Sequence, residues 1–422
     1  MSKVYYTLYD RMLSAKRLHQ SFQRVRANKG AAGIDGQTIE SFGAKLEENV
    51  DMLIRELREK SYRPQPVRRV EIPKPQGGVR KLGIPAVRDR VVQQALLEIL
   101  QPIFEENFHP SSYGYRPRRS QHQAIAKATM FIRQYDMNWV VDMDLTKCFD
   151  SLEHTIIIQS FRRRVTDGSI LRLVQMFLKS GVMIGNEWHK STEGSPQGGV
   201  ISPLIANVYL DAFDQFMKGR NHRIVRYADD ILIFTRSKSA AENARKQATR
   251  CLKKELKLTV NKEKTHVIHS RDGVRFLGVV IYTKYTGIQD DKVDRFKDKV
   301  KKITRRNSPV NLRKVIDDLN PVSRGFANYF KIANCKKEFM RTMQWIRRRL
   351  RAKQFALWKT PKRLHRRLRQ LGYSQEFKAP KMQSWRSAAS KYASFALPNE
   401  YFEMLGLFDL TTVQTGISVS VA

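Results

Sequence analysis

The sequence predicts an α+β fold followed by a basic, all-helical region. Up to about residue 288, short β-branched runs alternate with longer stretches in which apolar residues recur at helical spacing. From 291 to 370 the pattern is helical, and 26 Lys and Arg stand against 6 Asp and Glu. With 422 residues, the chain is long enough for two or three domains with sizeable cores.

The charge of the chain points to a polyanionic partner. It has 78 Lys and Arg against 40 Asp and Glu, a net charge of +38, so it would repel itself without such a partner. Nucleic acid is favoured over a membrane, because no stretch reaches the apolar length of a transmembrane helix. Cys148, Cys251 and Cys335 are too widely separated for a zinc cluster or a disulfide framework, which favours a reducing compartment.

The N-terminal segment 1–27 is basic and predicts a helix. Asp10 is its only acid, so a mitochondrial presequence is one interpretation, and an amphipathic helix on nucleic acid is the favoured one. The following loop, 28–36, contains three glycines, which permit a sharp reversal or close approach to a ligand. A second helix is predicted from Ile39 to Glu59.

A glycine-tipped hairpin comes next. Two strands, 67–74 and 80–85, are joined by Pro75-Gln76-Gly77-Gly78, with Lys74 and Arg80 at the tip. Flexible backbone beside cations could close over a triphosphate. A solvated hairpin explains this segment equally well.

Helices are predicted over 88–108 and 120–135, and between them lies the segment 112–119. This segment interleaves tyrosines with arginines, which suits stacking on bases and contact with phosphates. A surface loop with chance arginines is the alternative.

Carboxylates occur in two strand-like segments. In the strand 139–145, Asp142 and Asp144 share one face, which is costly in a core but suits a site open to ligand; a helix over 151–164 follows. Asp229 and Asp230 occupy the tip of a predicted hairpin over 224–234. Taken alone, such a pair is more often a solvated turn.

An irregular loop precedes the acidic hairpin. Residues 193–203 are rich in glycine and proline and lead into a helix that ends near Phe216. Such a loop, entering a helix N-terminus, can receive an anionic or flat ligand. After the hairpin we expect a helix over 240–256, a strand over 274–282, and a less charged tail from Ser384 that is partly loose after Pro398.

These acids suggest a chemistry together. Carboxylates gathered from two elements bind hard cations such as magnesium, and two such ions can activate a hydroxyl and stabilise a leaving phosphate. With a basic body, a cationic hairpin and an irregular loop, they describe a template-directed polymerase.

Several motifs carry a family resemblance. Tyr-Ala-Asp-Asp at 227–230 resembles the active-site motif of reverse transcriptases, and 141–150 resembles their earlier catalytic strand. The loop 195–204 and the segments 72–75 and 82–85 resemble their nucleotide loop and fingers, and 319–330 resembles a thumb/maturase signature. In order from about Asn28 to Trp358, the chain is similar to bacterial group II intron reverse transcriptase/maturases.

This resemblance implies a right-hand polymerase. Fingers with an N-terminal extension would span 1–136, a palm 137–287, a helical thumb/maturase domain 288–383 and a C-terminal tail 384–422. The implied function is RNA-directed DNA synthesis with two Mg²⁺, or Mn²⁺ as a substitute, on intron RNA. Splicing assistance and support of retromobility are implied as well.

The resemblance also implies roles for single residues. Asp144, Asp229 and Asp230 would bind the metals, while Asp142 would tune them or only support the strand. Phe149 would lie under the sugar, Gln197 would contact the nucleotide or template, Lys74 and Arg80 would hold the triphosphate, and the loop 28–36 would cover the template. Other contacts to nucleic acid would come from Asn28, Lys29, Arg116, Arg118, Lys262, Lys264, Arg324, Arg347, Arg348 and Arg349.

Three features refine the resemblance. Cys148 stands where the family usually has a second phenylalanine, and Phe326 replaces a common tryptophan. The absence of a Cys/His cluster after the basic region predicts a compact, group IIC-like form without a zinc-containing endonuclease.

The expected partners are an RNA template, a DNA primer or target and deoxynucleoside triphosphates, in the bacterial cytoplasm and not on a membrane. A homodimer is left open. Two alternatives also stay open: a freestanding relative recruited to DNA repair or phage defence, and an RNA-binding splicing cofactor with little polymerase activity.

Overall fold

The computed structural model describes residues 3–73, 77–185, 187–189, 193–194, 198–372, 391–417 and 419. The chain divides into two compact units, one up to His269 and one beginning at Ser270. The domain boundaries expected at 136, 287 and 383 stay predictions. No described helix is both long and apolar enough to cross a bilayer.

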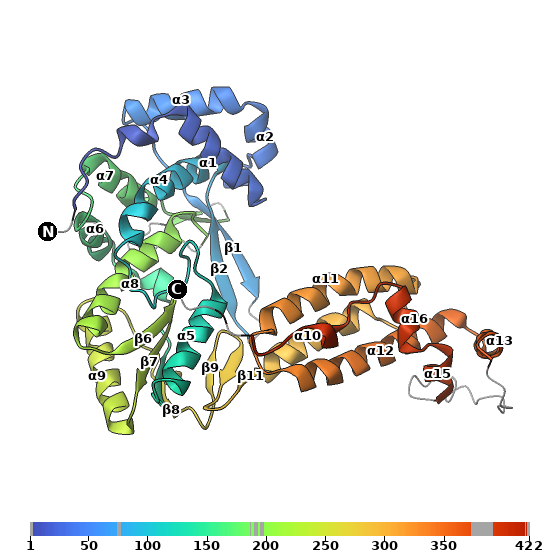
Figure 1. Ribbon diagram of the computed structural model, residues 1–422. Helices are drawn as coiled ribbons and strands as arrows, with labels where there is room; N and C mark the ends of the chain where they lie inside the picture. The colour runs from blue at the N-terminus through green and yellow to red at the C-terminus, as the bar shows by residue number, and fades with distance from the viewer. Residues whose placement is uncertain are drawn as a thin grey trace. The chain divides into compact units, whose positions relative to one another are not determined.

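The N-terminal part of the first unit is helical (Figure 1). It contains η1 (Asp10–Met12), α1 (Ala15–Ala27), α2 (Ile39–Ala44), α3 (Leu46–Arg58) and α4 (Val87–Glu105). The single helix expected over 39–59 is therefore two. The chain leaves helical geometry at Lys45, with φ −122° and ψ 42°, a break that no glycine or proline at that position announces.

A first sheet has the strand order β2-β1-β4-β5. The predicted hairpin is confirmed as β1 (Val67–Pro73) paired antiparallel with β2 (Val79–Ile84). The short hairpin β4 (Val182–Ile184) and β5 (Glu187–His189) extends the sheet, because β4 pairs in parallel with the start of β1.

A second, fully antiparallel sheet carries the acidic residues. Its order is β6 (Arg223–Tyr227), β7 (Asp230–Thr235), β3 (Trp139–Met143) and β8 (His266–His269). Helix α9 (Lys238–Lys254) covers one face, where Ala244 shares a core with Val141. On the other face lies α5 (Gln121–Arg133), whose Phe131 ring is 5.2 Å from that of Phe234.

The remaining elements of the first unit are η2 (Cys148–Ser151), α6 (His154–Arg162), α7 (Gly168–Lys179) and α8 (Ser202–Gly219). Apolar side chains of α6, α7 and α8 belong to the same core as those of α1, α3 and α4. A continuous core thus supports the acidic sheet from the side of α9.

The second unit begins with a three-stranded sheet of β9 (Val274–Phe276), β10 (Val279–Ile281) and β11 (Thr286–Ile288). The single strand expected over 274–282 is wrong. Leu277 and Gly278 have φ of 45° and 83°, so the chain reverses there and β9 and β10 form a hairpin.

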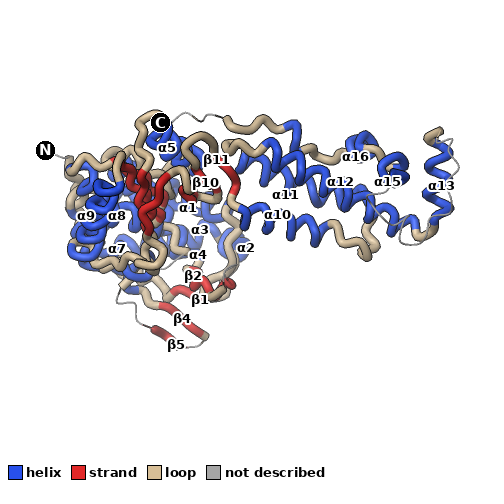
Figure 2. Tube along the Cα trace, turned by 90° about the horizontal axis from the view of Figure 1, so that it is seen from below, coloured by secondary structure: helices blue, strands red, loops and turns tan. Residues whose placement is uncertain are grey.

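Helices make up the rest of this unit. They are α10 (Asp290–Ile303), α11 (Leu312–Phe330), α12 (Lys336–Trp358), α13 (Pro361–Gln370), α15 (Lys391–Ala396) and α16 (Asn399–Met404), with η3 (Leu410–Thr412). Helices α10, α11 and α12 lie side by side (Figures 1 and 2). The Phe326 ring stacks on that of Phe296 at 4.1 Å, which fills this helical core without a tryptophan.

The tail beyond Pro398 is not loose in the described residues 399–417. Phe402 and Leu410 are fully buried. The Asn320 side chain donates to the carbonyl of Gly406 at 2.8 Å and accepts from the amide of Phe408 at 2.8 Å. Its low charge therefore reflects apolar side chains that pack on α11 and α12, and not a chain without a fold.

Candidate active site

The predicted acidic hairpin is confirmed. Tyr227 pairs with Asp230, and Ala228 and Asp229 form a two-residue turn between β6 and β7. Ala228 has a φ of 57°, in the left-handed region that favours glycine, and its side chain is buried. The turn is therefore strained as well as tightly packed.

The pairing of β3 with β7 brings the earlier carboxylates to this hairpin. Asp142 is opposite Leu232, and Met143 is opposite Ile231. One further step in this register places Asp144 opposite Asp230. Since alternate residues share a face and opposed residues lie on the same face, Asp142, Asp144 and Asp230 project from one face of the sheet.

The backbone of Asp144 is fixed from β8's side of the sheet. Its carbonyl accepts from the amide of Asn261 at 2.9 Å, and its amide donates to the Thr265 hydroxyl at 3.4 Å. The turn that holds Lys262 and Lys264 thus starts beside Asp144, and both lysines are exposed. The backbone of this turn is therefore tied to that of Asp144.

The acids raise one another's pKa values. Burial, then Asp229 and Asp144, raise the pKa of Asp230 to about 6. Burial, then Asp230 and Asp144, raise the pKa of Asp142 to about 7. The pKa of Asp229 is raised by burial and by Asp144. Each shift means that the charged form is disfavoured, so a cation beside this face would be stabilised.

The donor set fits a hard cation. Carboxylate oxygens are the ligands that Mg²⁺ prefers, and these come from two strands and a turn. In the part of the chain that the structure describes, no three His, Cys, Asp or Glu side chains converge on one ion position. The fit thus rests on the chemistry and the charge of the face.

An aromatic pair borders the acids. Phe149, in η2, meets Tyr115 edge-on, with ring centroids 6.2 Å apart and planes at 83°. Burial, followed by Asp229, raises the pKa of Tyr115, which places this ring near the turn. The charge of Arg80 lowers the pKa of Tyr115 and that of Asp229, against the net rise of each, so it also lies within reach of Asp229. Phe149 and Arg80 are thus grouped around the acids.

Lys74 and Gln197, predicted to contact the nucleotide, lie outside the described residues. Beyond Gln197 the loop is tied to its surroundings. At Gly198 the φ is 114°, and a Cβ would lie 2.4 Å from the carbonyl oxygen of Gly83 in β2. The Gln93 side chain of α4 accepts from the amide of Val200 at 2.8 Å.

The loop 28–36 is anchored at its centre. Arg68 donates to the carbonyl of Ala32 at 2.7 Å, and Arg90 donates to that of Ala31. A Cβ at Gly33 would lie 2.5 Å from the Cα of Ala86, so only glycine fits this approach. The start of the loop, with Asn28 and Lys29, remains exposed.

Arg116 has a different place from the one predicted. Its side chain is buried, and its guanidinium donates to the carboxylate of Glu105 at 2.7 Å and to the carbonyls of His109 and Ser112 at 2.8 Å each. These bonds use its donors inside the protein, so it holds the segment 105–116 and is not presented to phosphate. The neighbouring Arg118 is exposed.

In the second unit the predicted arginines divide in two. Arg324 and Arg348 are exposed, although Arg324 also lies over the Phe408 ring, 4.5 Å from its centroid. Arg347 donates to Asp409 at 2.8 Å, and Arg349 donates to the Thr304 hydroxyl at 2.7 Å. Arg347 and Arg349 therefore bind partners within the second unit.

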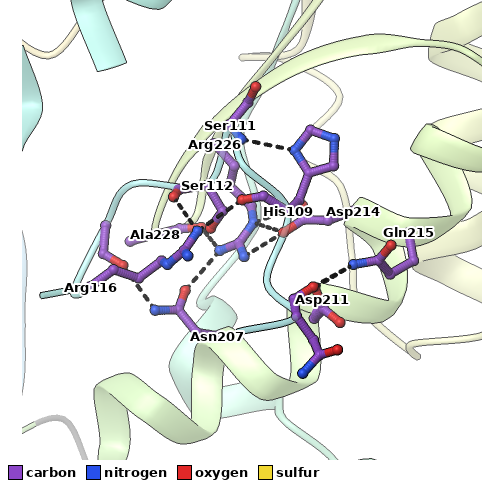
Figure 3. Close-up of polar contacts among 12 residues, drawn as sticks. His109, Ser111, Ser112, Arg116, Asn207, Asp211, Asp214, Gln215, Arg226 and Ala228 are labelled. Atoms are coloured by element: carbon purple, nitrogen blue, oxygen red, sulfur yellow. Dashed lines mark hydrogen bonds and ion pairs between the residues drawn. The ribbon is translucent and has the colours of Figure 1, made fainter. Parts of the chain in front are cut away.

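One residue without a predicted role is central to the site. Arg226 is completely buried and contacts Asp214, Asn207 and Ala228 (Figure 3). Two signals could have suggested this. An arginine lies between the apolar Val225 and the acids, and Asn207 and Asp214 are two helical turns apart, so they share one face of a helix.

Comparisons with known proteins show the family of the chain. Two family models match the sequence: "Reverse transcriptase (RNA-dependent DNA polymerase)" over residues 72–281, and "Group II intron, maturase-specific domain" over 293–372. Protein YkfC of Escherichia coli (strain K12) is 36% identical over 291 residues, covering 60% of this chain and 76% of that protein. Group II intron-encoded protein LtrA of Lactococcus lactis subsp. cremoris is 29% identical, covering 68% of this chain and 58% of LtrA.

Proposed function

Because this chain belongs to the group II intron reverse transcriptase/maturases, with the right-hand polymerase fold of that family, we propose that Asp144, Asp229 and Asp230 hold the metal ions for RNA-directed DNA synthesis. The observation that carries this proposal is the pairing of β3 with β7, which brings Asp144 to the acidic turn. The raised pKa values of Asp229 and Asp230 support it, because a bound cation would relieve the charge they share.

The other residues have supporting roles in this proposal. Two magnesium ions, or manganese in their place, would supply activation of the attacking hydroxyl and stabilisation of the leaving phosphate. Arg80, with Lys74, binds the triphosphate by charge, and Gln197 contacts the nucleotide or template. Phe149 packs under the sugar with Tyr115 behind it, and so disfavours a 2′-hydroxyl.

The helical unit gives the chain its second activity in the proposal. The maturase-specific match over 293–372 and the excess of Lys and Arg there support binding of intron RNA, for splicing and for mobility into DNA. Fingers over 1–136, a palm over 137–287, a thumb/maturase domain over 288–383 and a tail over 384–422 complete the assignment. The partners are the RNA template, a DNA primer or target and deoxynucleoside triphosphates.

Primer extension tests the proposal. With Mg²⁺, the full chain should extend a DNA primer on an RNA template, and Asp229→Asn should lower the rate by about 1000-fold because a metal ligand is lost. Asp51→Asn changes an exposed acid on α3 and should leave the rate unchanged.

Salt should be varied in this assay, since phosphate contacts weaken steeply as it rises. No extension by the unmodified protein at any salt concentration would refute the enzymatic function. Full activity of Asp229→Asn would instead refute the assignment of the metal ligands and leave the polymerase function standing.

A further inference from the structure

Arg226 connects helix α8 to the acidic turn. Its Nε donates to Asp214 at 2.9 and 3.0 Å, and its Nη2 donates to the same carboxylate at 2.6 Å. Its Nη1 donates both to the carbonyl of Ala228 and to the side chain of Asn207, at 3.0 Å each (Figure 3). One guanidinium thus fixes the orientation of a peptide group in the turn.

Asn207 extends this connection to a second segment. Its side-chain amide donates to the carbonyl of Gly114 at 2.8 Å. At Gly114, a Cβ would lie 2.3 Å from the amide nitrogen of Ala228 and 3.0 Å from the carbonyl carbon of Tyr227. The backbone at Gly114 therefore rests directly on the turn, and Asn207 holds it there.

The main chain of Arg226 is engaged as well. Its carbonyl accepts from the amide of Tyr113 at 2.8 Å, and its amide donates to the carbonyl of Ser111 at 2.9 Å. The amide of Ser111 in turn donates to Nδ1 of His109 at 3.0 Å. Burial lowers the pKa of His109, which keeps this nitrogen able to accept. The segment 109–114 is thus a fixed support for β6.

Burying the Arg226–Asp214 pair costs free energy that a strand with only a packing role would not need to spend. Arg226 and Asp214 are both 0% exposed, and a buried ion pair is often no more stable than apolar residues of the same volume. Its geometric effect falls on Ala228, whose φ of 57° must be maintained against strain. Catalytic groups require placement to within about 0.5 Å, and such placement needs a supporting shell of this kind.

We propose that Arg226, held by Asp214 and Asn207, is a positioning residue that fixes the acidic turn so that Asp229 meets Asp144 across a shared cation. The inference rests on the proposed function. A purely structural role, in which the pair only joins α8 to β6, predicts a loss of stability without any change at the cation site.

The substitution Arg226→Lys separates these roles in the full-length protein. A lysine keeps the positive charge beside Asp214, but its single ammonium cannot reproduce the fork that reaches Ala228 and Asn207. We expect kcat to fall by about tenfold or more, because misplacement of reacting groups is costly. We also expect Mn²⁺, followed by electron paramagnetic resonance without substrate, to bind several-fold more weakly, while primer–template affinity stays within about twofold.

Asp167→Asn is the matched control. Asp167 is buried in the same unit and accepts from the amides of Leu8 and Tyr9 at 2.8 and 2.9 Å, outside the acidic hairpin and its supporting segments. This variant should have a lower melting temperature than the unmodified protein. At temperatures where it is folded, its kcat and Mn²⁺ affinity should be unchanged. If Arg226→Lys does not fold, Asn207→Ala replaces it, with the same expected effects.

The outcomes are distinguishable. Unchanged kcat per folded molecule and unchanged Mn²⁺ affinity in the folded Arg226 or Asn207 variant would overturn the positioning role while the unmodified protein still extends primers. No extension by the unmodified protein would overturn the proposed function itself. The Mn²⁺ measurement would then still decide whether Arg226 shapes a cation site.

Discussion

Two sets of carboxylates in the first unit differ in what surrounds them. Asp214 accepts three short hydrogen bonds from Arg226, and Asp167 accepts from four backbone amides at the start of α7 and in the N-terminal segment. These acids are satisfied inside the protein, so their burial is compensated.

The acidic face of the second sheet is the opposite case. Within the described residues, no hydrogen-bond donor or cationic side chain pairs with the carboxylates of Asp142, Asp144 or Asp230. Instead, desolvation and then the proximity of the other acids raise the pKa values of Asp142 and Asp230. The first set stabilises the fold, whereas the second costs stability. Groups that cost stability are expected where a ligand uses them.

The comparison predicts its largest effect at Asp214. Replacing Asp214 by Asn leaves the Arg226 charge buried without its counterion, and we expect a loss of about 3–5 kcal/mol in the free energy of unfolding. Denaturant unfolding measures this. Asp211→Asn, one helical turn away, is the control, because the Asp211 carboxylate accepts from Gln215 and not from Arg226. Burial and the charge of Asp214 raise the pKa of Asp211 to about 6, so its charged form is disfavoured in the folded protein. Equal losses in both variants would contradict the comparison.

A smaller effect is expected at Asp142, and it should depend on pH. Its folded pKa of about 7 lies above the ordinary value of 3.8, so between these values the folded state binds more protons than the unfolded state. Stability from this group is therefore full below about pH 4 and is lost as the pH rises towards 7.

Asp142→Asn should abolish this dependence. At pH 7.5 without divalent cations, the variant should be more stable than the unmodified protein by about 1 kcal/mol after allowance for solvent screening, with almost no difference at pH 4. Thermal unfolding at both pH values checks this. A variant less stable at pH 7.5 would mean that Asp142 is satisfied by partners, like Asp214.

The acids themselves could be predicted from the sequence, because their signal is local. The β-branched residues around Asp229 and Asp230 predict a hairpin, and alternation within 139–145 places Asp142 and Asp144 on one face. Their meeting is a matter of strand pairing across some 85 residues, which periodicity does not contain. Only the family resemblance supplied it.

The errors share a physical origin. The identity of a partner decides whether Arg116 or Arg226 faces solvent or is buried, and partners such as Glu105 and Asp214 come from other elements. Likewise, the tail was expected to be loose because the surface of α11 and α12 against which it packs exists only after those helices have formed. Local patterns predict elements well, but they do not predict which charges those elements will pair.

The smallest effect is expected in the second unit, where Asp409 pairs with a partly exposed arginine. In the unmodified protein the Asp409 carboxylate accepts from the amide of Thr411 at 2.8 Å, and Asp409→Asn keeps an oxygen for this bond. The variant loses the ion pair with Arg347. Because the carboxamide keeps the bond from Thr411 and Arg347 keeps its longer contact with Glu403, we expect a loss of about 1 kcal/mol or less in unfolding free energy. The released Arg347 could then contact phosphate, so intron RNA should bind about twofold tighter at low salt, with a salt dependence steeper by about one phosphate contact.

Glu403→Gln is the control, since its contact with Arg347 is longer, at 3.4 Å, and its carboxylate is half exposed. If RNA affinity and its salt dependence are the same in Asp409→Asn as in the unmodified protein, Arg347 has a structural role, as Arg226 does, and does not contact RNA.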